Sequence, residues 1–195
     1  MSFHKTLPGF KALSRALMHK DDETQKHSSR VMFLAEELGK ACNLTNEELS
    51  TLKISACLHD IGKIGIPDAV LFKPTKFDEI DWDIMRTHPD KGDDIIRSLK
   101  LVQCEIIAEA VRHHHENFDG KGYPDKLSGE EIPYFARIVS IADSYDAMTA
   151  TRPYQKKRSH TETLDVLFSE EGSKSDPYLF RKFIGFVDHS EYRVR

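Results

Sequence analysis

Residues 45–62 read TNEELSTLKISACLHDIG and predict one helix with a defined start and end. Thr45 followed by Glu48 forms a capping box, which starts an α-helix. Apolar residues then recur at helical spacing until a glycine ends the pattern. The stretch therefore predicts a helix with one buried face and the polar pair His59 and Asp60 at its end.

Similar helical patterns occur on both sides of this stretch. No alternating pattern of useful length indicates a strand, so the predicted fold class is all-α. Glycines and prolines instead fill residues 115–133, and a loop of this length in a compact domain is usually functional. The residues expected to be helical are 1–20, 22–42, 78–87, 90–99, 101–114, 134–150, 161–170 and 176–187.

The chain is expected to have two parts. Residues 1–20 carry an apolar stripe from Phe3 to Leu17 and are predicted to form an N-terminal lead-in helix. This helix either docks on the core or pairs with another copy, and it is the one feature that suggests a homodimer. Residues 21–195 are expected to form the main domain.

Composition excludes several classes of protein. The 195 residues include 28 lysines and arginines against 32 aspartates and glutamates, a net charge of −4 that argues against a binder of polymeric nucleic acid. No run is apolar enough to span a membrane, and the N-terminus lacks the apolar core of a secretory signal. Three scattered cysteines fit a reducing compartment, so a cytoplasmic location is expected.

The unusual feature is a set of histidines and carboxylates at the ends of predicted helices. Taken singly, each has an ordinary explanation, such as a solvated ion pair, a helix cap or a local hydrogen-bond acceptor. Together they suit a polynuclear metal site, and a set without cysteine favours iron or manganese over structural zinc. The residues are Glu23 and His27 on one helix face, His59 and Asp60, His88 at the end of a helix, His114 and His115 before the loop, and Asp143 inside an apolar segment.

Several linked motifs resemble those of the HD-GYP family, bacterial metal-dependent phosphodiesterases of the HD superfamily. The resemblance covers about residues 20–187. The motifs are LHDIGKIGIPD at 58–68, His88-Pro89, HHENFDGKGYP at 114–124, IADSYDAMT at 141–149 and Arg-Pro-Tyr at 152–154.

The resemblance implies an HD-domain helical bundle with an ordered GYP loop and a catalytic domain over residues 21–195. It implies hydrolysis of cyclic di-GMP to linear pGpG, and in some members onward to GMP, with two or three divalent metals, iron or manganese. Asp60 is expected to bridge two metals, and Lys63 to approach the scissile phosphate. Tyr123 and Arg152 are expected to contact substrate. The implied metal ligands are Glu23, His27, His59, Asp60, His88, His114, His115 and Asp143.

Glu23 corresponds to the extra ligand of members that hold three metals. Lys73 and Lys121 could add positive charge for the substrate, while Tyr123 and Phe118 either stack on a guanine or anchor the loop. The chain departs from the usual family pattern at Thr75, at Gln155 and at the segment 173–177. His4, His19, His113, His160 and His189 are expected to have no role in metal binding.

Two alternatives to a cyclic di-GMP phosphodiesterase stay open. The same fold could act on 3′,3′-cyclic GMP-AMP or on a linear nucleotide. The chain could also be a low-turnover adaptor that senses cyclic di-GMP and docks a GGDEF-type or sensory partner. A complete ligand set argues against the adaptor.

Overall fold

The protein is described here by a computed structural model that places residues 7–100, 103–150 and 158–193. Within these ranges every regular element is a helix, and the one bridge joins Glu171 to Ser175, so the all-α prediction is confirmed. The elements are α1 (Leu7–Lys20), α2 (Asp22–Ala41), α3 (Asn46–Leu58), the 3₁₀-helix η2 (Ile61–Gly65), α4 (Asp68–Leu71), α5 (Glu79–Met85), α6 (His88–Ser98), α7 (Cys104–His113), η3 (Gly129–Glu131), α8 (Tyr134–Thr149), α9 (His160–Ser169) and α10 (Pro177–Val187).

Local sequence signals set where the central helices begin. The predicted capping box is present at α3: the Glu48 amide donates to Thr45 Oγ1 at 3.3 Å, and the Thr45 amide donates to Glu48 Oε2 at 2.8 Å. At α2, the Asp21 carboxylate accepts from the amides of Glu23 and Thr24. Each cap satisfies amides that have no partner inside the helix.

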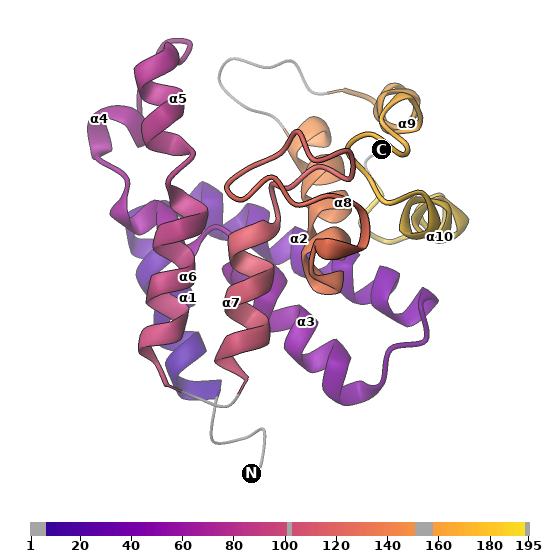
Figure 1. The fold of residues 1–195 in the computed structure, drawn as a ribbon, viewed down its shortest axis with the longest axis horizontal. Coiled ribbons are helices and arrows are strands. Elements are labelled where there is room, and N and C mark those ends of the chain that lie inside the picture. The colour runs from indigo at the N-terminus through magenta and orange to yellow at the C-terminus, as the bar shows by residue number, and fades with distance from the viewer. Residues whose placement is uncertain (1–6, 101–102, 151–157, 194–195) are drawn as a thin grey trace.

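Two apolar clusters form the core, and α3 contributes to both. The first gathers residues of α2, α3, α8, α9 and α10 around Leu38, Leu52 and Phe180. The second gathers residues of α1, η2, α6 and α7 around Leu58 and Ile107. Figure 1 shows where these helices lie. The end of α3 therefore lies where the two clusters meet.

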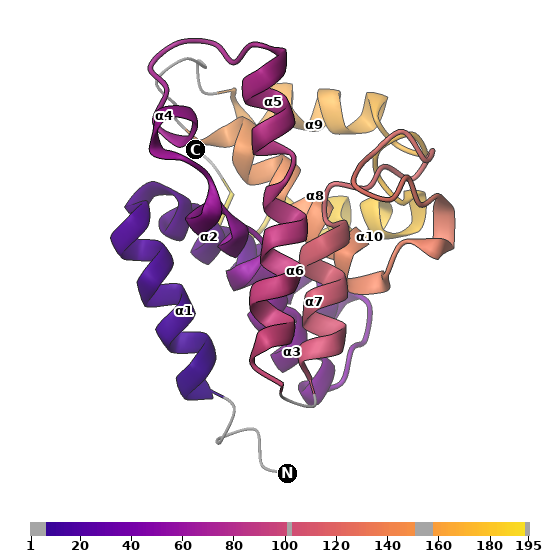
Figure 2. The same cartoon turned by 60° about the vertical axis from the view of Figure 1, so that its left-hand side comes forward.

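Helices α6 and α7 lie side by side, while α1 runs along one flank of the molecule (Figure 2). Phe10 and Leu17 of α1 are buried in the second cluster, so this helix docks on the core.

The prediction that His88 ends a helix was wrong. His88 begins α6, because Pro89 fits the first turn of a helix, where no amide is required.

Close approach between η2 and α6 depends on Gly62. A Cβ atom at this position would lie 1.9 Å from the carbonyl oxygen of His88 and 2.6 Å from the amide nitrogen of Gly92. Any side chain here would push α6 away from the end of α3. The glycine after the HD pair therefore allows His88 to come near Asp60.

The loop of residues 115–133 is held by backbone hydrogen bonds to distant segments. The Phe118 amide donates to the carbonyl of Lys174 at 3.1 Å, and the Asp119 amide donates to that of Ser173 at 2.8 Å. The loop is therefore fixed against the connection between α9 and α10.

None of the helices in the described ranges is long and apolar enough to cross a membrane.

Candidate metal centre

Five separate elements bring their polar side chains to the junction of the two core clusters. His59 and Asp60 follow α3, His88 begins α6, and His114 and His115 follow α7. His27 comes from α2 and Asp143 from α8. The pair that follows α3 thus supplies the middle of the site, the ends of α6 and α7 supply His88, His114 and His115, and the bodies of α2 and α8 supply His27 and Asp143.

Three imidazoles are oriented by the same local device. Nδ1 of His59, His88 and His114 lies 2.7, 2.8 and 2.7 Å from the carbonyl oxygen of the residue three positions earlier. Each Nδ1–H donates to this carbonyl, so each Nε2 carries a lone pair toward the centre. Histidines that bind metals commonly donate their second ring nitrogen in this way.

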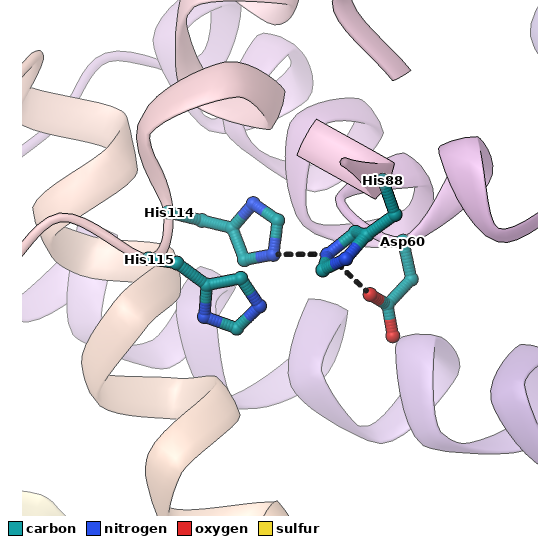
Figure 3. Close-up of side chains that lie close together, drawn as sticks. All are labelled: Asp60, His88, His114 and His115. Atoms are coloured by element: carbon teal, nitrogen blue, oxygen red, sulfur yellow. Dashed lines mark hydrogen bonds and ion pairs between the residues drawn. The ribbon is translucent and has the colours of Figure 1, made fainter. Parts of the chain in front are cut away.

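His88 and His114 present these lone pairs to one another. Their Nε2 atoms lie 3.4 Å apart, and His88 Nε2 lies 3.3 Å from Asp60 Oδ1 (Figure 3). Burial lowers the pKa of His88 to about 3 and that of His114 well below its usual value, with further lowering by neighbouring positive groups. Because both rings are neutral, neither nitrogen donates to the other. Such a pair is stabilised by a cation between them.

Asp60 faces two groups of ligands, one with each carboxylate oxygen. Oδ1 lies on the side of His88, whereas Oδ2 lies 3.4 Å from His59 Nε2 and 4.0 Å from His27 Nε2. Although burial favours the protonated acid, the Lys63 ammonium and nearby imidazoles hold the pKa of Asp60 well below its usual range. An ionised carboxylate between two ligand groups has the geometry of a bridge between two metals.

The described residues contain two sets of candidate ligand atoms, each with all members within 4.8 Å of one another. One set is Asp60, His88, His114 and His115, and the other is His27, His59 and Asp60. His59 Nε2 is buried and has no hydrogen-bond partner among the residues that the structure describes. This donor set of imidazoles and one shared carboxylate fits two divalent metals.

Asp143 and Asp146 of α8 hold the imidazole of His27, which comes from α2. Asp143 Oδ1 lies 2.9 Å from His27 Nε2, and Asp146 Oδ2 lies 2.7 Å from His27 Nδ1. Burial would lower the pKa of His27, but hydrogen bonds to the two carboxylates outweigh it and raise the pKa to about 9. Arg30 also donates to Asp146, through Nε at 2.7 Å and a terminal nitrogen at 2.9 Å. Sequence reasoning missed Asp146, although its spacing of three from Asp143 on one helix is a readable signal.

Lys63 and Glu23 occupy contrasting places. Lys63 Nζ donates to Asp60 Oδ2 at 2.6 Å, so its ammonium is part of the centre. The Glu23 side chain is 80% exposed and pairs with Lys26 at 3.0 Å. The structure therefore does not bring Glu23 to the other candidate ligands, and its role as a third-metal ligand stays a prediction.

Tyr123 of the loop is next to the centre. Its ring stacks on that of His115, with centroids 4.9 Å apart and planes 28° apart. Burial raises the pKa of the Tyr123 hydroxyl, and the carboxylates of Asp60 and Asp143 raise it further, so the group remains a hydrogen-bond donor. Arg152, the other predicted substrate contact, lies outside the described residues, as does Gln155.

Two acids and a histidine that the sequence reasoning left without a role hold this loop. The buried Glu116 accepts from the Asp125 amide at 2.7 Å, and the Asp125 carboxylate lies 2.9 Å from Nε2 of the buried His113. A Cβ at Gly122 would lie 2.2 Å from the Asn117 amide nitrogen, so only glycine fits the turn. These contacts position Tyr123 beside His115.

Two further lysines that were predicted to add charge are engaged elsewhere. Lys73 pairs with the carboxylates of Asp78 and Asp81 at the start of α5. Lys121 pairs with Asp119 at 2.9 Å, and its side chain is 80% exposed. Both charges are therefore largely compensated by local acids.

Comparison with known proteins identifies the family of this chain. The model of a family described as HD domain matches residues 11–179. The chain belongs to the HD domain family. The resemblance to HD-GYP proteins is confirmed by this match and by relatives of this chain that are named as cyclic di-GMP phosphodiesterases.

Two curated relatives illustrate the similarity. The HD domain is 37% identical over 165 residues to the cyclic di-GMP phosphodiesterase response regulator RpfG of Xanthomonas campestris, covering 85% of this chain and 44% of that protein. It is 35% identical over 167 residues to 3'3'-cGAMP-specific phosphodiesterase 2 of Vibrio cholerae, covering 86% of this chain and 32% of the relative. The chain thus spans less than half the length of these relatives.

A solved structure shares the fold of the HD domain. The crystal structure of the cyclic GMP-AMP specific phosphodiesterase V-cGAP3 of V. cholerae superimposes with a TM-score of 0.68 at 22% identity. The alignment covers 94% of this chain and 49% of that chain. At this identity the match establishes the helical architecture alone.

Proposed function

We propose that this HD domain is a metal-dependent phosphodiesterase that hydrolyses cyclic di-GMP to linear pGpG. The observation that carries the proposal is the position of Asp60, whose two oxygens face two separate groups of ligand nitrogens. A pair of bound divalent ions supplies an acidified water and a clamp for the phosphate. The names of relatives similar over most of the chain support a cyclic dinucleotide as substrate.

The proposed ligands are His27, His59, His88, His114 and His115, with Asp143 beside them and Asp60 as the bridge. Lys63 is proposed to stabilise the negative charge that builds on the phosphate oxygens, because its ammonium already lies at the bridge. Tyr123 is proposed to donate its hydroxyl to substrate and Arg152 to bind a phosphate. Iron or manganese is the proposed metal.

A third metal held by Glu23 would suit the onward cleavage of pGpG to GMP. In the structure its carboxylate pairs with Lys26 on the surface, so pGpG is the proposed main product. Partners of GGDEF or sensory type, a homodimer and a cytoplasmic location stay predictions.

A second candidate substrate is 3′,3′-cyclic GMP-AMP. It is supported by the 35% identity to the V. cholerae enzyme that is named as specific for 3'3'-cGAMP. The two dinucleotides share their phosphates and differ in one base, so the metal centre does not distinguish them.

The test is a turnover comparison. Protein loaded anaerobically with ferrous iron or manganese is incubated with each cyclic dinucleotide, and products are separated by chromatography. Faster conversion of cyclic di-GMP to pGpG supports the proposal, whereas faster conversion of cyclic GMP-AMP supports the second candidate. Binding without conversion of either substrate over hours would refute the enzyme and favour an adaptor.

A further inference from the structure

A groove of about 500 Å3 lies between α1, α2 and α3, and the candidate metal centre does not use it. Its volume falls within the roughly 300–1,000 Å3 typical of pockets that hold small organic ligands. None of the candidate metal ligands lines it. The groove is therefore a separate feature of the fold that needs its own explanation.

The floor of the groove is apolar. Phe10 of α1 and Leu58 of α3 are 4% and 1% exposed, and both belong to the second core cluster. Met32 and Ile54 are half-buried against the two clusters, and Cys57 lies beside Ser14 with its sulfur 3.8 Å from Oγ. A ligand seated here would bury an apolar body.

One rim of the groove is positively charged without compensation. Lys11 and Arg15 lie one turn apart on α1, and both are exposed. Neither forms an ion pair within the part of the chain that the structure describes, and α1 itself contains no aspartate or glutamate. By contrast, Lys53 on the opposite rim is matched by Glu36 at 2.8 Å.

We propose that this groove binds an amphipathic monoanion, namely a carboxylate with an unbranched alkyl chain. The chain lies on the floor formed by Phe10, Ile54 and Leu58, and the carboxylate lies at the rim formed by Lys11 and Arg15. Arginine binds carboxylates through paired hydrogen bonds, and burial of the alkyl chain supplies the rest of the affinity. No acidic side chain is found among the described lining residues to oppose this charge.

The location gives such a ligand direct contact with the helix that carries the HD pair. Cys57 and Leu58 line the groove, and His59 and Asp60 follow them in the chain. The proposal concerns binding alone and does not depend on which substrate the metal centre hydrolyses.

Protection of Cys57 from alkylation tests the proposal. The full chain is treated with iodoacetamide with and without decanoate, and modification is followed by peptide mass spectrometry. Cys42, which is also half-exposed but lies at the end of α2, serves as the internal control. We expect decanoate to slow the alkylation of Cys57 severalfold and to leave Cys42 unchanged, while butyrate and decyltrimethylammonium protect neither thiol. Equal rates with and without decanoate would overturn the proposal, as would equal protection by the cationic amphiphile.

Paired variants separate the headgroup from the apolar floor. Replacing both Lys11 and Arg15 by glutamine should weaken the affinity for decanoate by about tenfold, because charge-assisted hydrogen bonds are lost. The matched control replaces Arg181 and Lys182 of α10 by glutamine and should leave the affinity unchanged. An unchanged affinity in the first variant would refute the assigned rim.

A second pair of variants fills the groove. Ser14→Phe places a ring in the groove and should abolish protection of Cys57 by decanoate, whereas Ala16→Phe adds the same ring on an exposed position of α1 and should not. Circular dichroism checks that both variants keep their helices. Full protection by decanoate in a folded Ser14→Phe variant would contradict the proposed site.

Discussion

His27 and His88 are both buried imidazoles of the candidate metal centre, yet their protons are set in opposite ways. His88 donates Nδ1–H to a backbone carbonyl, and burial lowers its pKa to about 3. His27 lies between the carboxylates of Asp143 and Asp146, which raise its pKa to about 9 against the effect of burial. At neutral pH without metal, the first ring is ready to bind a cation and the second carries a proton.

The difference shows that the two halves of the centre are preorganised by different means. The half with His88 and His114 is aligned by helix-end carbonyls, so its Nε2 lone pairs are available at once. In the half with His27, His59 is aligned by a carbonyl as well, but His27 is aligned by charge, so a metal there must displace a proton from His27. Asp60 belongs to both halves and joins them.

The largest effect is expected from removing the residue that the halves share. Asp60→Ala should abolish hydrolysis and lower metal content in both halves, because each candidate set loses its carboxylate. Metal analysis and the dinucleotide assay measure this, with Asp83→Ala as the control, since that side chain is 77% exposed. Full activity in Asp60→Ala would show that the metal assignment is wrong.

The next effect separates chemistry from metal binding. Lys63→Ala should retain the metals and lower kcat by about 10²–10³-fold, the loss typical of removing one donor to a developing charge. Metal analysis and the dinucleotide assay on one sample of this variant measure both quantities. Loss of metal from this variant would make Lys63 a support of Asp60 and would remove its proposed role toward phosphate.

A smaller effect should fall on one half alone. Asp146→Asn removes the charge behind His27 and should weaken metal affinity of the His27 half by about 10–100-fold, as is usual when the partner of a metal-binding histidine is changed. Stepwise metal titration should show one weakened binding step and one that is unchanged. Equal weakening of both steps would argue against separate halves.

The pH dependence of stability in the metal-free protein should have opposite signs at the two imidazoles. The pKa of His27 is raised on folding from 6.5 to about 9, so its stabilisation is complete below pH 6.5 and is lost as the pH rises toward 9, at most about 3 kcal/mol. The pKa of His88 is lowered on folding to about 3. Below pH 6.5 the unfolded chain gains a proton at His88 that the folded protein does not, so the folded state loses stability as the pH falls.

Urea unfolding from pH 5 to 9.5 of the wild type, His27→Gln and His88→Gln measures these slopes. The free energy of unfolding of the wild type should exceed that of His27→Gln at low pH, and this excess should shrink as the pH rises. As the pH falls, the free energy of unfolding of the wild type should decrease relative to that of His88→Gln. Parallel curves for the three proteins would contradict the assigned protonation states.

The smallest effect is expected at Glu23. Since its carboxylate pairs with Lys26 on the surface, Glu23→Ala should leave pGpG formation and the two principal metals unchanged. Only a third metal or the onward cut to GMP should be affected. Slower formation of pGpG in this variant would place Glu23 in the main centre.

Most of the fold was predictable because its signals are local. The capping box at Thr45, the apolar periodicity and the glycine-rich loop act within a few residues of one another. His88 was predicted to end the helix of residues 78–87, whereas it begins the next helix, because a histidine before proline fits either a helix end or a first turn. The proline at the first turn of α6 decides between them.

The site was predictable in its residue types but not in its protonation. That Asp146 holds His27 depends on how α2 and α8 are oriented against each other, whereas the pair of Glu23 with Lys26 is local, three residues apart on α2. The contact between Asp125 and His113 likewise depends on the path of the loop. The spacing of three from Asp143 marks Asp146 as a candidate, but no spacing in the sequence identifies the distant histidine that Asp146 or Asp125 contacts.

The most direct test of the central claim is manganese titration of the metal-free protein followed by electron paramagnetic resonance. If Asp60 bridges two sites, the protein should bind two ions per chain at a separation of roughly 3.5–4 Å, and their spins should be coupled. In Asp60→Ala the coupling should disappear. Saturation by a single ion, or by two ions without coupling in the wild type, would contradict the account.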